Sequence, residues 1–212
     1  MTYFRDVATL ARKDLLLELR ARDTVPAMLL FVVAALVVFH FALPEQSSRL
    51  AASGMLWIAL LFTALLALVR AFVGERDGAT LDGLILAPCD RSAIWLGKAL
   101  SVLAFLLFAE AVALPAFGLF YERVTWELVA GLALANLGIA AVGTLLGAMA
   151  AAARARELLL PLLFLPVAIP LVVGGVGSAA ASEPSRYLLF LGLYDAVFAV
   201  LSWASFEYVV TE

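Results

Sequence analysis

The chain has 212 residues, of which 65% are hydrophobic and 15% charged, and its formal net charge at pH 7 is −3. A soluble domain of this length needs more polar surface, because polar side chains dominate the exteriors of globular proteins. Apolar runs of about 18 residues or more recur along the chain, and such runs are typical of transmembrane helices. A β-barrel would instead show alternating segments of about ten residues. The sequence therefore predicts an all-α integral membrane protein.

The first 22 residues form a basic, partly amphipathic segment ahead of the first apolar run. One helical face would carry the side chains of Phe4, Val7, Ala11, Leu15 and Leu19, with basic side chains on another face. We expect a helix that lies in the cytoplasmic interface and is held there by anionic lipid. The alternative is a basic flank that only sets topology. The segment has no apolar core near the terminus and no small-residue cleavage site, so we expect no cleaved signal peptide.

Six apolar stretches follow, with short connections between them. We expect spans at about residues 25–43, 52–73, 95–120, 126–152, 157–180 and 187–208. No long linker or low-complexity tract separates the spans. Residues 1–212 are therefore predicted to form a single transmembrane domain.

Lysine and arginine are distributed unevenly among the connections. Eleven lie in the N-terminal segment, around residues 74–98, or between the fourth and fifth spans. The other side carries only three, which are Arg49, Arg123 and Arg186. Positively charged residues concentrate on the cytoplasmic side of membrane proteins. We therefore expect both termini and the segment 74–98 to be cytoplasmic.

The connection between the second and third spans is polar and has signs of local structure. It lies within the stretch FVGERDGATLDGLILAPCDRSAIWLGK, residues 72–98. Pro88 cannot continue a helix and disfavours the helical conformation at Ala87. Asp90 is typical of an N-cap, because its carboxylate can accept from the free N–H groups of a first helical turn. We expect a short helix at about residues 76–87, a turn, and then the third span.

This short helix is a candidate docking surface. Its apolar side chains recur at helical spacing and would anchor a partner, with charged residues forming the rim. The candidate contact residues are Glu75, Arg76, Asp77, Thr80, Leu81, Leu84 and Ile85. The alternative is that the apolar face rests on lipid headgroups and binds no protein.

The sequence shows no catalytic constellation. The phosphate-binding pattern G-x-x-x-x-G-K-[ST] is absent, so the chain itself is not expected to bind or hydrolyse ATP. His40 is the only histidine and Cys89 the only cysteine, so neither a histidine metal cluster nor an internal disulfide can form. Both residue types can ligate heme iron, but the predicted topology places these two on opposite sides of the membrane. We predict neither an enzyme nor a metal site.

Two carboxylates lie deep within apolar runs. They are Glu110, in LLFAEAVAL, and Asp195, in LGLYDAVFAV. A charged carboxylate at the centre of a bilayer costs about 2.5–3.5 kcal/mol on insertion scales, so each should face protein or water and have a partner. Three roles are open: a hydrogen bond between helices, a polar position in a transport path, or a proton relay. Asn136 and Tyr194 are candidate partners.

Proline and glycine interrupt the fifth span. We expect a kink near Pro166 or a break at Gly174 and Gly175, with freed carbonyls satisfied by neighbouring helices. Such a point could act as a hinge during transport, and a static kink is the alternative. In the fourth span, Gly143 and Gly147 have the G-x-x-x-G spacing that permits close helix packing.

Four segments, in the same order, resemble the heme exporter protein B (CcmB) family, the permease subunits of the ABC transporter used in cytochrome c maturation. They are ARKDLLLELR, GMLWIALLFTALLALVRAF, GERDGATLDGLILAPCDRSAIWLGK and the closing FEYVVTE. The resemblance covers essentially the whole chain and agrees with its length and six spans. It implies an ABC-2-like exporter permease in the bacterial inner membrane, operating as a homodimer. In such permeases, the loop between spans two and three carries a coupling helix that fits a cleft in the ATPase.

The resemblance also implies partners. A cytoplasmic ATPase subunit (CcmA) would bind the ATP, alongside a heme-handling subunit (CcmC), a small membrane subunit (CcmD) and a heme chaperone (CcmE). Heme would be a ligand that is transported or handled, with no resident cofactor expected, and no nucleic-acid partner is expected. ATP hydrolysis could drive heme export or release of the heme-loaded chaperone. Because no heme site is visible in the sequence, we favour release. The alternatives are a small ABC permease for another substrate and a membrane scaffold that does not transport.

Overall fold

The computed structural model describes residues 2–20, 24–42, 49–77, 89–121, 123–152 and 156–211. In these residues it contains seven helices and no strand. The helices are α1 (Thr2–Arg20), α2 (Thr24–Ala42), α3 (Arg49–Asp77), α5 (Arg91–Phe120), α6 (Trp126–Ala152), α7 (Arg156–Ala180) and α8 (Pro184–Thr211). All except α1 are long and apolar enough to cross a membrane. The predicted all-α class with six spans is confirmed.

The observed spans agree with the predicted ones to within four residues. Their apolar windows are Val25–Ala42, Ala51–Phe72, Arg91–Phe120, Trp126–Ala151, Leu158–Ala180 and Pro184–Val209. The largest difference is at α5, which begins at Arg91 rather than near residue 95. Asp90 causes this early start, because its extended backbone places Oδ1 2.9 Å from the N–H of Ser92, as an N-cap requires. The predicted cap is confirmed.

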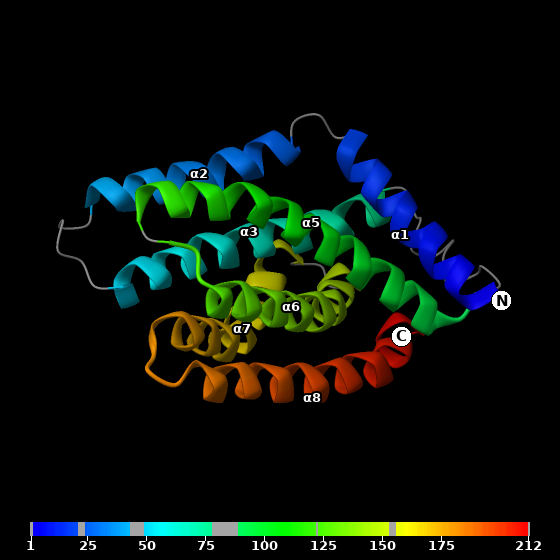
Figure 1. The fold of residues 1–212 in the computed structure, drawn as a ribbon. Coiled ribbons are helices and arrows are strands. Elements are labelled where there is room, and N and C mark those ends of the chain that lie inside the picture. Colours follow the sequence, from blue (N-terminus) through cyan, green and yellow to red (C-terminus); the bar gives the residue numbers. More distant parts are fainter. Residues whose placement is uncertain are drawn as a thin grey trace.

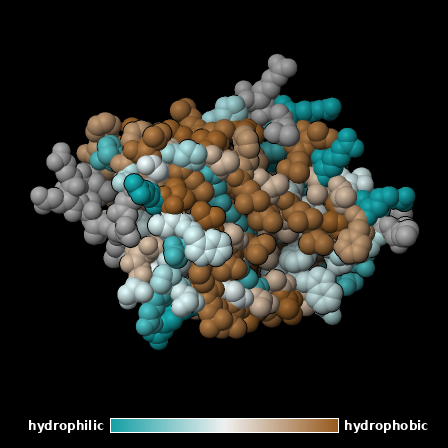
Figure 2. All heavy atoms as spheres, viewed as in Figure 1, coloured by the Kyte–Doolittle hydropathy of each residue, from teal (hydrophilic) through white to brown (hydrophobic). Residues whose placement is uncertain are grey.

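Helix α6 is the centre of the bundle. It packs against α3, α5, α7 and α8, and 67% of its apolar window is buried (Figure 1). Helix α2 lies at the edge beside α3 and α5, and only 17% of its window is buried. Figure 2 shows that hydrophobic residues cover most of the middle of one face, while hydrophilic residues gather toward the two ends. A helical membrane protein has this surface, because lipid solvates the apolar belt.

The glycines of α6 admit side chains of α3. A Cβ atom at Gly143 would lie 2.6 Å from Leu68, and one at Gly147 would overlap the ring of Phe72. The side chains of α3 therefore occupy the space that larger residues on α6 would fill. The close packing predicted from the G-x-x-x-G spacing is confirmed, and it fixes α3 against the central helix.

Helix α7 runs unbroken from Arg156 to Ala180 through its prolines and glycines, so the expected break at Gly174 and Gly175 does not occur in this structure. These glycines are points of close contact instead. A Cβ at Gly174 would lie 2.7 Å from Leu191 of α8, and one at Gly175 would overlap the Trp57 indole of α3. A hinge at Pro166, Gly174 or Gly175 remains a prediction.

Helix α1 crosses the beginning of α5 (Figure 1). Val7 and Ala11 are buried in this contact, as the predicted apolar face requires. A Cβ at Gly97 would lie 2.8 Å from Cβ of Leu10, so α1 and α5 are in close contact at this glycine. Phe4 departs from the prediction and is 78% exposed. The first turn of α1 directs Tyr3 toward α5 instead, and the adjacent Phe4 points away.

Candidate functional site

One end of the bundle brings together the start of α1, the start of α5 and the end of α8. Ser92 Oγ donates to the Tyr3 hydroxyl at 3.1 Å, and Arg91 Nη1 lies 3.0 Å from Glu207 Oε1. Both termini and the residues just before α5 therefore lie at the same end, as Figure 1 also shows. This agrees with the predicted topology, in which they share one side of the membrane. That this side is the cytoplasm remains a prediction.

The predicted docking residues begin at this same end. Glu75, Arg76 and Asp77 are the last residues of α3. The first two residues of the helix expected at 76–87 therefore belong to α3 rather than to a separate helix. The other candidates lie outside the described residues, and their role stays a prediction. They are Thr80, Leu81, Leu84 and Ile85.

Lys98 is a buried charge that ties three helices together near this end. Its side chain is 3% exposed, and Nζ donates to the Ala71 carbonyl of α3 at 3.0 Å. The same atom lies 3.4 Å from Oδ2 of Asp14 on α1 and 4.6 Å from the centre of the Phe72 ring. A buried ammonium needs such partners to offset the loss of hydration. Lys98 is one of the eleven basic residues from which the topology was predicted, and its buried position was not predicted. The signal for it was a lone lysine within an apolar helix.

A small hollow of about 40 Å³ lies beside this cluster, between α1, α3 and α5. Asp14 and Glu18 of α1 line it together with Ser101 of α5. Burial raises the pKa of the Glu18 carboxyl, and the positive charge of Arg70 opposes that shift. The contact between α1 and the bundle is therefore polar and charged as well as apolar.

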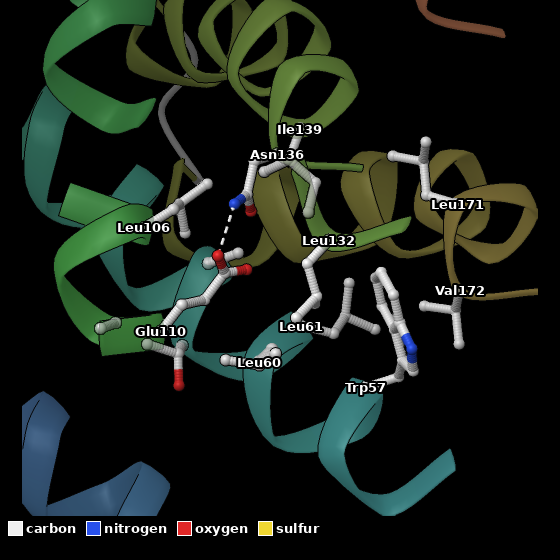
Figure 3. A pocket seen from close by; sticks show the side chains of 13 residues that line it. Trp57, Leu60, Leu61, Leu106, Glu110, Leu132, Asn136, Ile139, Leu171 and Val172 are labelled. Carbon is white, nitrogen blue, oxygen red and sulfur yellow. Dashed lines mark hydrogen bonds between the residues drawn. The ribbon is translucent and has the colours of Figure 1, made fainter. Parts of the chain in front are cut away.

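Glu110 lies in the core of the bundle and is joined to the central helix. Its Oε2 accepts a hydrogen bond from Asn136 Nδ2 of α6 at 2.9 Å (Figure 3). This confirms Asn136 as a partner. Both side chains are buried and line a cavity between α3, α5, α6 and α7. Its free volume is about 10 Å³, close to the space that one water molecule needs.

Asp195 lies at a different position, on α8. Its two carboxylate oxygens are buried and have no hydrogen-bond partner among the described residues. They lie against Gly138 of α6, where a Cβ would come 2.5 Å from Oδ1. The adjacent Tyr194 donates to the Val167 carbonyl at 2.7 Å, so its hydroxyl hydrogen serves α7 rather than either carboxylate. The structure therefore does not bring Glu110 and Asp195 into one site.

His40 and Cys89 lie at opposite ends of the bundle. His40, in the last turn of α2, contacts the rings of Phe120 and Tyr121 at the end of α5, with centroids 5.3 and 5.6 Å away. Cys89 lies just before α5 begins. The 30 residues of α5 separate them by about 45 Å, at 1.5 Å per residue. The prediction that they lie on opposite sides of the bundle is confirmed. Within the described ranges, no group of three metal-ligating side chains occurs.

A family model described as CcmB protein matches residues 5–206, which is nearly the whole chain. The chain belongs to the CcmB family. The predicted resemblance to this family is thereby confirmed, and with it a multi-pass membrane protein of the kind that the six apolar helices indicate. The match includes the first three of the four segments and ends at Phe206, where the fourth begins.

Curated relatives in the CcmB family agree over similar lengths. Heme exporter protein B of Rhodobacter capsulatus is 30% identical over 92% of this chain and 94% of its own. The protein of the same name from Paracoccus denitrificans is 30% identical over 84% of this chain and 86% of its own. The protein of that name from Pseudomonas aeruginosa is 27% identical over 91% of this chain and 90% of its own. The family-model match over residues 5–206 includes the first five spans, the segment between α3 and α5, and most of α8.

Proposed function

We propose that this chain is the membrane permease subunit of an ABC transporter complex in cytochrome c biogenesis, located in the bacterial cytoplasmic membrane and acting as a homodimer. The observation that carries the proposal is the match of the CcmB family model over residues 5–206. Relatives named heme exporter protein B, which align over almost their full length, support it. The six apolar helices provide the membrane domain that such a subunit needs.

In this proposal, a cytoplasmic CcmA-like ATPase docks on the segment that follows α3. Helix α3 supports this role, because it continues as one helix from its apolar window to Asp77. Its side chains Leu68 and Phe72 fit against the glycines of α6. A displacement of the end of α3 by the ATPase would therefore be transmitted to α6 through these closely packed contacts.

The output that we propose is mechanical: ATP hydrolysis drives release of a heme-loaded CcmE-like chaperone from a CcmC-like subunit, with a small CcmD-like subunit alongside. The size of the cavity beside Glu110 supports this choice. Its 10 Å³ is far below the roughly 300–1,000 Å³ of pockets that hold drug-sized ligands. Heme would therefore need a wide separation of α3, α5, α6 and α7 to pass through this position.

Co-purification tests the docking step. Tagged full-length chain is isolated from bacterial membranes as wild type, Leu84→Asp and Val124→Asp, and the ATPase is detected by immunoblot. Val124 is the matched control, because it is partly exposed in the connection at the opposite end of α5. We expect wild type and Val124→Asp to retain the ATPase and Leu84→Asp to lose it, at equal permease levels.

Other outcomes separate the alternatives. Retention of the ATPase by all three proteins would place the contact outside the 76–87 segment. If none retains it, the non-transporting scaffold becomes the better interpretation. Deletion of the gene and measurement of c-type cytochromes tests the cargo, because a permease for another substrate would leave their content unchanged.

A further inference from the structure

We propose that Glu110 is a proton-binding site, which the closed bundle holds as the neutral carboxylic acid with one buried water beside it. This inference does not depend on ATPase coupling or on heme, because it rests on the surroundings of one side chain. The carboxyl group projects from α5 toward Asn136 of α6, between walls supplied by α3 and α7 (Figure 3).

Among the described residues that line the cavity, none carries a positive charge that could neutralise a carboxylate. Of its 13 lining residues, nine are aliphatic, and the groups that can hydrogen-bond belong to Thr63, Glu110, Asn136 and Trp57. The Trp57 Nε1–H is a neutral donor and has no hydrogen-bond partner among the described residues. Glu110 is the only acidic or basic side chain among them. An ionised carboxylate in such surroundings would lose its hydration without gaining a counter-charge, which is strongly unfavourable.

The charged and titratable groups farther away do not change this conclusion. Leu171 of α7 lines the cavity and also packs near Gly138, where Asp195 lies, but Asp195 is itself an acid and Tyr194 cannot supply positive charge. The buried cation Lys98 is on the same helix, 12 residues before Glu110. That spacing corresponds to about 18 Å along α5, and its ammonium group is already bound to Asp14 and Ala71.

The hydrogen-bonding groups match a neutral acid and one water. Asn136 Nδ2 donates to Oε2, which then serves as the carbonyl oxygen, and the proton resides on Oε1. A water in the cavity would accept from this O–H and donate to Thr63 Oγ1, whose own hydrogen is used in its 2.8 Å bond to the Ala59 carbonyl. Those two contacts meet the minimum that a buried water needs, in a space of the right size.

The proton thus links the charge of Glu110 to the packing of four helices. Separation of α3, α5, α6 and α7 would admit bulk water, and hydration would let the carboxyl release its proton. Closure would require the proton to return. Any movement that opens this part of the bundle should therefore exchange a proton with the solvent.

Infrared spectroscopy of the full-length chain in lipid, at pH 7, tests the proposal. The wild-type spectrum minus that of Glu110→Gln should contain a carboxylic-acid C=O band that shifts in D₂O, with no carboxylate band. The matched control is Glu183→Gln, since Glu183 is exposed and paired with Arg186 at 3.2 Å. That pair of spectra should instead differ by the carboxylate bands of one ionised group. Carboxylate bands in the Glu110→Gln difference would overturn the proposal.

A second variant keeps the test valid if Glu110→Gln does not fold. Asn136→Leu removes the amide that donates to Oε2, so the acid C=O band should move to higher frequency and stay present. An unchanged band would show that the acid signal does not come from Glu110 and would reject the site. Loss of the band, with new carboxylate bands in its place, would also reject it.

Discussion

Lys98 of α5 is buried and forms an ion pair with the partly exposed Asp14 of α1, with Nζ and Oδ2 3.4 Å apart. The pair joins the N-terminal helix to the bundle beside the end of α3, where Lys98 also binds the Ala71 carbonyl. We expect Asp14→Ala to lower the free energy of unfolding by about 1.5–3 kcal/mol, because it removes a charge-assisted contact between this carboxylate and a buried ammonium group. Thermal unfolding of the purified protein in detergent, followed by circular dichroism, measures the change.

The companion variant is Lys98→Met, which removes the buried charge and fills its space. It should be less destabilising than Asp14→Ala, since the Asp14 side chain is 16% exposed and retains Lys13 at 3.0 Å. The double variant should recover part of the stability lost in Asp14→Ala. If Asp14→Ala proves neutral, the ion pair does not hold α1 in place.

Gly175→Ala tests the close contact between α7 and α3. The added Cβ would overlap the Trp57 indole, so we expect a loss of about 1–3 kcal/mol from overpacking. Gly192→Ala in α8 is the matched control, because a Cβ there meets no atom within 4 Å. That change should be neutral or stabilise by up to about 1 kcal/mol through helix propensity. Equal melting temperatures for the two variants would contradict the packing described here.

Asp90 should make the stability of α5 dependent on acid pH. Hydrogen bonds from the Ser92 side chain and backbone lower the pKa of the Asp90 carboxyl. Its stabilising contribution is therefore fully present above the unfolded pKa, near 4, and is lost as pH falls through the lower folded value. Asp90→Ala should cost about 1 kcal/mol at pH 7, whereas Asp90→Asn should keep the cap and lose only the pH dependence.

Acid titration of the melting temperature between about pH 6 and pH 2 checks the prediction for Asp90. As the pH falls and the Asp90 carboxyl is protonated, the melting temperature of the wild type should approach that of Asp90→Ala. The difference between Asp90→Asn and Asp90→Ala should stay constant. A constant difference between wild type and Asp90→Ala at every pH would show that ionisation of the cap has no effect.

Tyr121→Phe tests how α2 is held at the edge of the bundle. The Tyr121 hydroxyl donates to the Leu36 carbonyl of α2 at 2.6 Å, and its loss should cost about 1 kcal/mol. Tyr187→Phe is the control, because the Tyr187 ring packs on Gly177 and no hydrogen bond of its hydroxyl occurs among the described residues. Proteolysis of the α2 region should also accelerate in Tyr121→Phe but not in the control.

Much of the fold was predictable because the length and hydropathy of contiguous segments determine which of them can cross a membrane. A run of apolar residues must be helical in lipid to satisfy its backbone, so the six spans followed from hydropathy alone. The Asp90 cap and the close packing at Gly143 and Gly147 also depend on local chemistry that the sequence displays. The family could be recognised for the same reason, since its characteristic segments are contiguous.

What only the tertiary structure decided were the partners of each buried polar group. The sequence marked Glu110 and Asp195 as costly residues, but hydropathy cannot show that one has Asn136 and that the other lies against Gly138 without a hydrogen-bond partner among the described residues. It likewise could not show that Lys98 points into the bundle, or that the glycines of α7 accommodate Trp57 and Leu191. These contacts join helices far apart in the chain, and they depend on which faces meet when the helices pack.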